Sequence, residues 1–245
     1  MEAKSSTLPP LIAIVGCDGS GKSTVSEELL AWIIKDYGPA AAAHLGKQQG
    51  NAGRSAGSLP LIGNWLGRFI KRKASTVHKN RTVDMASDTF PAIVMYAFTL
   101  RRVRRYRRMM ALRRQGLIII ADRYPQLVTH SVPDSSDMTV TAQGNRFVRW
   151  LAQREQSLFE WMTSYVPDLV IRLNVDLDTA FARKPDHRRE SLARKISILP
   201  QVTYNGAPIA EIDASQPLEQ VLAAVKAAVT RTLSERGYQQ SGGRA

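Results

Sequence analysis

The chain has 245 residues, with 34 Lys and Arg against 21 Asp and Glu, which gives a formal net charge of +13. This length is enough for one domain with a sizeable core. With 44% hydrophobic and 22% charged residues, the composition excludes a wholly disordered or collagen-like chain. The single cysteine, Cys17, excludes a disulfide framework and a cysteine-based zinc site.

The positive charge is concentrated in one third of the chain. Residues 46–115 hold sixteen Lys and Arg and two acidic residues, whereas the remainder holds eighteen basic and nineteen acidic residues. A basic block of this kind usually faces phosphate, nucleic acid or an anionic membrane surface.

The N-terminal ten residues are polar and lack the apolar run of a signal peptide. The longest apolar stretch, 90–100, is shorter than the roughly 20 residues that a membrane span needs. We therefore expect a cytoplasmic protein, and peripheral contact with an anionic membrane stays open.

The first predicted strand, 11–15, leads directly into Gly16-Cys-Asp-Gly-Ser-Gly-Lys-Ser23, and a predicted helix follows over 22–37. This is a phosphate-binding P-loop in its required context, between a strand and a helix. The backbone N–H groups of the loop and the helix N-terminus would cradle phosphates. Lys22 would reach the β- and γ-phosphates of ATP, and the Ser23 hydroxyl would bind Mg²⁺. The expected nucleotide-binding residues of the loop are Gly16, Asp18, Gly19, Ser20, Gly21, Lys22, Ser23 and Thr24.

Asp18 is less usual in such a loop, because phosphate would repel a carboxylate beside it. We expect it to point toward a hydroxyl of a second substrate, and the alternative is a turn or capping residue. Cys17 fills a variable position of the loop. We expect that its alkylation would block nucleotide entry.

A second strand is expected at 41–45, followed by a basic insertion over 46–89 on the acceptor side. Within the insertion, 59–73 mixes apolar residues with a basic end. It is either a packed element or an interfacial membrane anchor. A long helix then covers about 90–115 and carries eight arginines in the fourteen residues 101–114. Most of these arginines are expected to be solvated, and Tyr106 alone interrupts the run with an aromatic ring, which argues against nucleic acid as partner.

The next strand, 117–121, ends in Asp122, at the place where a P-loop protein carries an Asp that holds Mg²⁺. Arg123 follows, and its charge would stabilise the transferring phosphoryl group or grip a phosphate of the acceptor. The alternative is a strand-end acid paired with its neighbouring arginine. The remaining elements are helices at 145–165 and 217–236 and strands at 169–175 and 208–213. Alternating strands and helices predict a five-stranded parallel sheet covered by helices on both faces.

Two motifs together resemble the thymidylate kinase branch of the P-loop nucleoside monophosphate kinases: Asp18-Gly-Ser-Gly-Lys-Ser-Thr24 and Asp122-Arg-Tyr124. Phe98-Thr-Leu-Arg-Arg102 is similar to the family's helix segment whose arginine binds the acceptor phosphate. The stretches 167–175 and 212–215 are similar to the strand before the lid and to the segment near the adenine.

The resemblance implies a three-layer P-loop NTPase fold in a single domain, 1–245, with a helical lid at 183–199. From the sequence itself we expect the ends, 1–9 and 239–245, to be flexible. It implies that Asp18, Arg101, Arg102, Arg123 and Tyr124 bind the acceptor. It implies lid arginines that close over ATP and neutralise charge, with Arg183 and Arg188 as catalytic candidates and Arg189 as a nucleotide contact. It also implies a homodimer.

His187 is the one histidine expected near the site, because the histidines at 44, 78 and 130 show no metal-ligand spacing. The acceptor side departs from the family, since Val15 precedes the loop and residues 44–50 lack its Arg-Glu-Pro-Gly segment.

The sequence thus predicts an ATP- and Mg²⁺-dependent phosphotransferase in which Lys22, Asp122 and Arg123 are catalytic, acting on a nucleoside monophosphate. Two alternatives remain open. One is a kinase of a non-nucleotide acceptor such as a phosphorylated or lipid-linked sugar, and the other is a nucleotide-binding module that docks an anionic surface.

Overall fold

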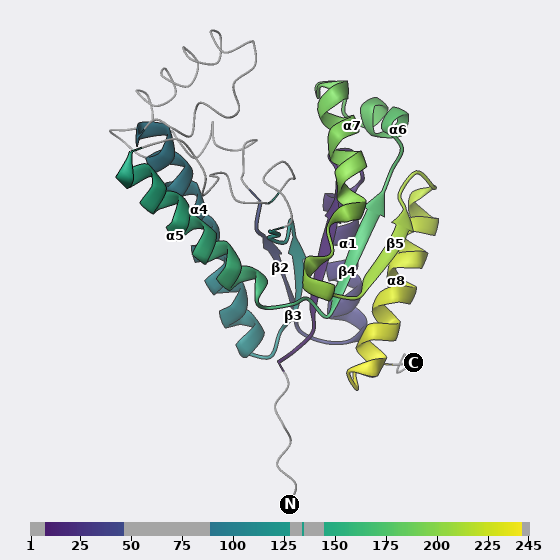
Figure 1. Ribbon diagram of the computed structural model, residues 1–245. Helices are drawn as coiled ribbons and strands as arrows, with labels where there is room; N and C mark the ends of the chain where they lie inside the picture. The colour runs from purple at the N-terminus through teal and green to yellow at the C-terminus, as the bar shows by residue number, and fades with distance from the viewer. Residues whose placement is uncertain (1–7, 47–88, 128–133, 135–144, 242–245) are drawn as a thin grey trace, which may run out of the picture.

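The computed structural model describes residues 8–46, 89–127, 134 and 145–241 (Figure 1). The expected insertion at 46–89 lies outside the described residues except for its two end residues, and so does the whole of 59–73. Of the ends expected to be flexible, residues 1–7 and 242–245 also lie outside them.

The described part of the chain forms one sheet of five parallel strands in the order β2-β3-β1-β4-β5. The strands are β1 (Leu11–Gly16), β2 (Ala40–His44), β3 (Ile118–Asp122), β4 (Leu169–Asn174) and β5 (Ile209–Asp213). The apolar runs 11–15 and 118–121 form β1 and β3 because both faces of these inner strands are buried. The predicted five-stranded parallel sheet is confirmed.

Helices connect the strands and cover both faces of the sheet. They are α1 (Lys22–Asp36), α4 (Thr89–Arg114), α5 (Arg146–Thr163), α6 (Leu177–Arg183), α7 (Arg189–Ile198) and α8 (Leu218–Glu235). Two short 3₁₀ turns, η3 (Leu199–Gln201) and η4 (Tyr204–Gly206), lie between α7 and β5. The long helix ends before Gly116, whose φ of +96° stops it as its place in the sequence predicts.

Alternation along β1 builds the two halves of the core. Ile12 and Ile14 pack against α1 and α8, whereas Leu11 and Ala13 pack against α4 and α5 on the opposite face. All four side chains are fully buried. Figure 1 shows the resulting layers, with α4 and α5 on one side of the sheet and α1 and α8 on the other. The predicted three-layer α/β fold is confirmed.

α4 and α5 run parallel to each other. Three hydrogen bonds join them, and each links residues 56 positions apart: Asn145 to Thr89, Thr99 to Glu155, and Tyr106 to the Met162 carbonyl. This constant offset keeps the N-terminal ends of both helices level, and the longer α4 extends beyond the C-terminal end of α5. No helix in the described segments is long and apolar enough to cross a membrane.

The strand order brings the functional loops together. β1 lies between β3 and β4, so the segments that follow these three strands meet at the carboxyl edge of the sheet. In open α/β sheets, ligands bind at this edge where the direction of the strand order changes.

Candidate functional site

The P-loop joins β1 to α1 as the sequence predicts. β1 ends at Gly16 and α1 begins at Lys22, with Gly21 at its N-cap and no side chain capping the helix. The first N–H groups of α1 therefore face the loop without a side-chain partner, which is the arrangement that binds an anion.

Gly19 is required where it stands. Its φ is +87°, and a Cβ there would lie 2.7 Å from the Ala180 carbonyl oxygen of α6. α6 therefore packs directly against the loop. Any larger residue would have to move either the loop or that helix.

Lys22 lies at the centre of the site and is only 8% exposed. Its Nζ donates a hydrogen bond to the Cys17 carbonyl oxygen at 2.5 Å, so the side chain folds back along its own loop. Burial lowers the pKa of Lys22, and the nearby Arg123 lowers it further, whereas the charges of Asp18 and Asp122 act in the opposite direction. Arg123, Asp18 and Asp122 are thus each within electrostatic range of Lys22.

The hydroxyl residues of the loop differ in accessibility. Ser23 and Thr24 are exposed at the start of α1, as metal or phosphate contacts require. Ser20 is buried, and its Oγ has no hydrogen-bond partner within the described part of the chain.

Asp18 is surrounded by cationic side chains. It pairs with Lys195 of α7, its Oδ1 lies 3.3 Å from Arg123 Nη2, and its Oδ2 lies 3.8 Å from His187 Nε2. Burial favours the neutral acid, but the hydrogen bond and charge of Lys195, with the charges of Lys22 and Arg123, lower the pKa of Asp18 to about 2. The carboxylate is therefore ionised at neutral pH.

Asp122 stands at the end of β3, where its partner across the sheet is His44 at the end of β2. His44 Nδ1 lies 2.7 Å from Asp122 Oδ2. The expectation that His187 is the one histidine near the site is therefore wrong. The pairing of β2 with β3 brings a second histidine to Asp122, and the sequence did not reveal that register.

The other oxygen of Asp122, Oδ1, is buried and has no hydrogen-bond partner among the described residues. An orphaned carboxylate oxygen is the kind of ligand that Mg²⁺ takes, and Mg²⁺ often needs only one or two protein oxygens besides phosphate and water. The exposed Ser23 hydroxyl and Asp122 Oδ1 therefore fit the expected metal. The described segments contain no cluster of three His, Cys, Asp or Glu side chains that would hold a metal ion by itself.

Arg123 has a strained backbone. Its φ is 60°, in the left-handed region that side chains other than glycine avoid, at a cost of about 1–3 kcal/mol. A Cβ at Gly46 would collide with Arg123 Cδ, so the arginine side chain passes directly over that glycine. These constraints hold the guanidinium beside Asp18.

The arginines expected to bind the acceptor differ in their surroundings. Arg101 is exposed, whereas Arg102 is 3% exposed and fully engaged inside the protein. Arg102 donates from Nε to the Leu45 carbonyl oxygen at 2.8 Å, and its two terminal nitrogens donate to the backbone and side chain of Asp134 at 2.9 and 3.0 Å. In this structure its guanidinium ties α4 to the end of β2.

Tyr124 is also part of the scaffold. Its ring is 2% exposed, and its hydroxyl bonds with Tyr106, 2.9 Å away, and donates to the Tyr165 carbonyl oxygen. Burial raises the pKa of Tyr124 to about 12. The hydroxyl expected to contact the acceptor is thus occupied by hydrogen bonds in the core below α4 and α5.

The lid candidates lie on α6 and α7, which follow β4 and stand beside α1 in Figure 1. Arg183 Nη1 donates to the carbonyl oxygens of Gly19, at 3.3 Å, and Ala214, at 2.8 Å, so it links the P-loop to the segment after β5. Arg188 caps α7 without a side-chain bond, and Arg189 pairs with the exposed Asp178.

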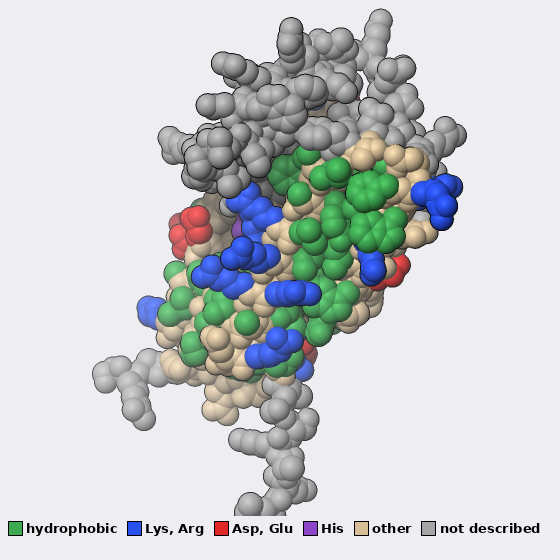
Figure 2. Space-filling view, turned by 90° about the vertical axis from the view of Figure 1, so that its left-hand side faces the viewer, with side chains coloured by type: hydrophobic (Ala, Val, Ile, Leu, Met, Phe, Trp, Pro, Cys, Tyr) green, Lys and Arg blue, Asp and Glu red, His purple; other side chains and the backbone are tan. Residues whose placement is uncertain are grey.

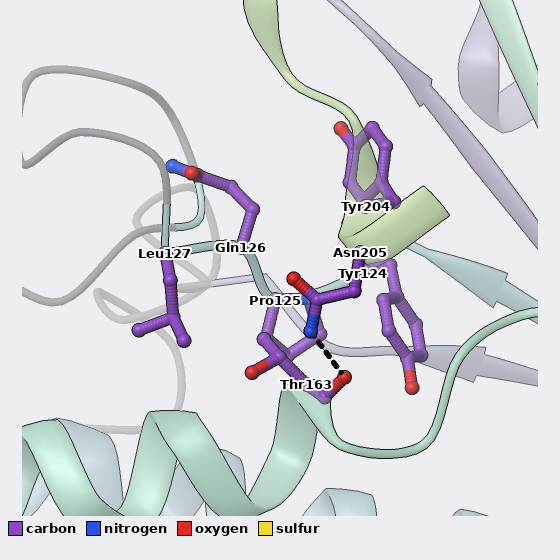
Figure 3. Close-up of a pocket in the computed structure, with 7 residues that line it drawn as sticks. All are labelled: Tyr124, Pro125, Gln126, Leu127, Thr163, Tyr204 and Asn205. Atoms are coloured by element: carbon purple, nitrogen blue, oxygen red, sulfur yellow. Dashed lines mark hydrogen bonds between the residues drawn. The ribbon is translucent and has the colours of Figure 1, made fainter. Parts of the chain in front are cut away.

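A small pocket lies beside this site, after β3 (Figure 3). No charged side chain and no P-loop residue lines it, and Asn205 on one side donates to the Thr163 carbonyl oxygen at 2.9 Å. The pocket therefore carries no feature that would bind phosphate. Its lining residues are Tyr124, Pro125, Gln126, Leu127, Thr163, Tyr204 and Asn205.

Sequence reasoning missed two residues of the site. Lys195 lies beyond the arginine cluster at 183–189, and α7 has to turn back toward the P-loop before its side chain reaches Asp18. His44 is the last residue of β2, level with Asp122. The one signal in the sequence was its position in the segment 44–50, where the thymidylate kinase family carries its Arg-Glu-Pro-Gly motif.

Comparison with known proteins places the chain among relatives of the same length. It is 40% identical to YghS of Escherichia coli K12, described as an uncharacterized ATP-binding protein, over 96% of this chain and 98% of that protein. It is 36% identical to YghR of the same strain, described in the same words, over 91% of this chain and 88% of that protein. No protein-family model matches. Because both relatives are more than 30% identical over at least 88% of both chains, the chain belongs to the family of YghS and YghR.

Proposed function

We propose that this protein binds ATP at the P-loop and transfers its γ-phosphoryl group to an acceptor, a nucleoside monophosphate. One observation carries the proposal: the pairing of β3 with β1 sets Asp122 and Arg123 beside the P-loop that holds the buried Lys22, and Arg123 Nη2 lies 3.3 Å from Asp18 Oδ1 of that loop. Simple nucleotide binding needs Lys22, but it needs neither a carboxylate nor a cation at the end of β3. The ATP-binding descriptions of YghS and YghR support the nucleotide half.

The chain's own residues would do little covalent work. Lys22 and the N-terminus of α1 would hold the β- and γ-phosphates, and Arg123 would neutralise charge as the phosphoryl group moves. The bond between the β-phosphate oxygen and the γ-phosphorus breaks, a bond to the acceptor oxygen forms, and ADP leaves. Mg²⁺, held by Ser23 and Asp122 Oδ1, would supply further charge neutralisation when bound.

Lys195 extends the set of lid residues. Its ammonium group pairs with Asp18, a residue of the phosphate-binding loop itself. Arg189, by contrast, pairs with the exposed Asp178 of α6. ATP phosphates would compete with Asp18 for Lys195 and Arg123. The cations would then turn to phosphate, and the carboxylate would become available to a hydroxyl of the acceptor. Arg183 and Arg188, on the same side of the loop, are the further lid candidates.

A kinase of a non-nucleotide acceptor is the second candidate, and a specific observation favours it. The arginine that resembles the acceptor-phosphate residue, Arg102, is already saturated by Leu45 and Asp134. His44, the last residue of β2, begins the segment where the family carries its nucleotide-binding motif. Exposed Arg101 and the end of β2 would then face a differently shaped acceptor.

Release of ADP tests the proposal. The purified protein with ATP and Mg²⁺ is offered dTMP, dUMP, UMP, CMP, AMP and GMP in turn. We expect acceptor-dependent ADP release with at least one of them. Lys22→Ala should reduce it by about 10²–10⁴-fold, because that residue supplies several kcal/mol of transition-state stabilisation.

Calorimetric binding of ATP separates the outcomes. If the protein binds ATP but releases no ADP with any of the six monophosphates, the acceptor is assigned as a non-nucleotide. Full turnover in Lys22→Ala would overturn the phosphotransferase assignment at this loop.

A further inference from the structure

The outer face of α4 and α5 exposes large apolar side chains. Ile93 and Leu100 on α4 and Phe147 and Trp150 on α5 are each between 44% and 47% exposed. Of the nine large hydrophobic residues that are exposed in the described part of the chain, five lie on these two helices. The Phe147 and Trp150 rings stack, with centroids 5.9 Å apart and planes 20° apart. An apolar cluster of this kind on a surface marks an interaction site.

The same face is strongly basic. α4 contains no acidic residue, and in α5 Glu155 is buried, which leaves Glu160 as the exposed acid of the pair. Figure 2, which looks onto this side of the molecule, shows Lys and Arg side chains beside a band of hydrophobic ones. Besides Arg101, which is a candidate acceptor contact, the exposed arginines of the two helices are Arg104, Arg107, Arg108 and Arg114 on α4 and Arg146, Arg149 and Arg154 on α5.

The helix register gives the face an internal order. The parallel offset of 56 residues places Trp150 almost level with Ile93, so the apolar groups of both helices gather at their N-terminal halves. On α4, Leu100, Arg104 and Arg108 follow one another at four-residue spacing on the exposed side, so the basic groups continue the apolar ones along the helix. Arg154 lies over the Trp150 ring, 5.7 Å from its centroid.

We propose that the outer face of α4 and α5 docks on an anionic lipid bilayer. The apolar side chains would enter the headgroup boundary, where Trp is favoured, and the arginines would face lipid phosphates. The P-loop lies at the carboxyl edge of the sheet, so docking through the outer helical layer leaves it accessible. The proposal does not depend on the identity of the phosphoryl acceptor.

Charge decides among the occupants of this face. A symmetric contact between two copies would set one arginine-rich face against another, with Glu160 as the exposed acid to offset the repulsion. Nucleic acid would satisfy the arginines, but it offers no apolar environment to the aliphatic Ile93 and Leu100. An anionic bilayer satisfies both kinds of side chain.

Vesicle sedimentation tests the proposal. The full-length protein is spun with vesicles of phosphatidylcholine alone and of phosphatidylcholine with about one third phosphatidylglycerol. We expect it to pellet with the anionic vesicles, and we expect binding to weaken as salt rises, because screening shortens the reach of the arginines. Failure to pellet with anionic vesicles overturns the proposal.

Two double variants locate the face. Phe147→Ser with Trp150→Ser removes the stacked pair, and its matched control is Ile34→Ser with Leu218→Ser, two side chains of similar exposure on α1 and α8. Arg104→Gln with Arg108→Gln removes two charges, and its control is Lys35→Gln with Arg231→Gln. We expect each face variant to weaken vesicle binding about tenfold or more and the controls to leave it nearly unchanged.

Three results would contradict the assignment. Equal loss in face variants and controls would show general surface binding. A dimer in solution that Phe147→Ser with Trp150→Ser converts to monomer would assign the face to a second copy. Release from vesicles by a short RNA at low concentration, with tight RNA binding that the arginine variant abolishes, would assign it to nucleic acid.

Discussion

At the scale of single residues, Asp18 organises the site. A carboxylate in a phosphate-binding loop opposes the ligand, yet the structure surrounds this one with Lys195 and Arg123. The arrangement is consistent if Asp18 holds the cations while phosphate is absent. The ionised carboxylate, whose pKa is about 2, would then supply part of the negative charge that the ATP phosphates supply when nucleotide is bound.

Substitution of Asp18 by Asn should therefore tighten ATP binding. The neutral amide neither repels phosphate nor competes for Lys195, so we expect the dissociation constant of ATP, measured by titration calorimetry, to fall by about three- to tenfold. Asp178→Asn is the matched control, because it removes the exposed carboxylate that pairs with Arg189 on the same pair of helices. Unchanged or weaker ATP binding in Asp18→Asn would contradict the competition.

Cys17 offers a direct probe of the same loop. Cys17 is 3% exposed and its thiol is free, and burial raises the pKa of the thiol above its usual range. Because the thiolate is the reactive form, we expect alkylation of the folded protein at pH 7.5 to be about tenfold slower, or more, than that of a small thiol.

The rate should climb as the pH passes 9, and unfolding should abolish the protection. Since Cys17 is the one cysteine of the chain, mass spectrometry measures it without ambiguity. Fast labelling at neutral pH would show that the loop opens readily. The expected block of ATP binding can be measured on the same labelled protein.

At the scale of elements, Asp168 fastens three of them together at the edge of the sheet opposite the site. Its Oδ2 accepts from the Leu11 backbone N–H at 2.7 Å and from Arg113 of α4 at 2.9 Å, and its Oδ1 pairs with Arg236 after α8 at 2.8 Å. Arg113 is itself 6% exposed. Removal of the carboxylate leaves a buried cation and a strand N–H without their partner.

We expect Asp168→Ala to lower the free energy of unfolding by about 3 kcal/mol, because one partner of a largely buried ion pair is lost. The measurement is urea unfolding at pH 7. Asp178→Ala serves as control, since its pair with Arg189 is mostly exposed and should change the unfolding free energy by about 0.5 kcal/mol or less. Equal effects in the two variants would show that burial does not decide the contribution of Asp168.

The elements themselves could be predicted from local sequence. An apolar run such as 118–121 has no polar residue to face water, which predicts a buried strand. The fixed residue spacing of the P-loop predicts where the strand before it ends and the helix after it begins. The predicted bounds agree with the structure to within a residue or two. The side-chain roles were harder because they depend on contacts between distant segments. Arg102 could not be recognised as a structural residue, since its partners Leu45 and Asp134 lie 57 and 32 positions away. The role of His44 likewise depends on the register of β2 against β3, and the role of Lys195 depends on the turn that brings α7 back to the P-loop.

At the scale of the whole molecule, the described residues include two groups of cationic side chains that lie on different surfaces. Arg123 and Lys195 gather with Lys22 at the carboxyl edge, where each has an acidic partner or neighbour. The arginines of α4 point largely outward on the face that we assign to an anionic bilayer. Within the described residues, the cations of the site and the exposed arginines of α4 therefore form two separate groups, and we expect each group to meet its own anionic partner.

Lys22 connects function with global stability. Its pKa is lowered by burial and by Arg123, so the folded state disfavours its charge relative to the unfolded chain below about pH 10. Lys22→Met keeps the length of the side chain but removes that cost. We therefore expect the variant without nucleotide to unfold at the same temperature as the wild type or a few degrees higher, as at other sites where activity opposes stability.

Ligand should reverse this order. With ATP and Mg²⁺ at about 100 times the dissociation constant, the wild type gains roughly 2.7 kcal/mol of unfolding free energy by mass action, and its melting temperature rises. Lys22→Met should gain little at the same concentrations, because the phosphates lose their buried cation. Thermal unfolding of both proteins with and without ATP measures all four values. A variant that melts lower without nucleotide, yet shifts as far as the wild type with it, would show that Lys22 is a structural residue and not the phosphate contact.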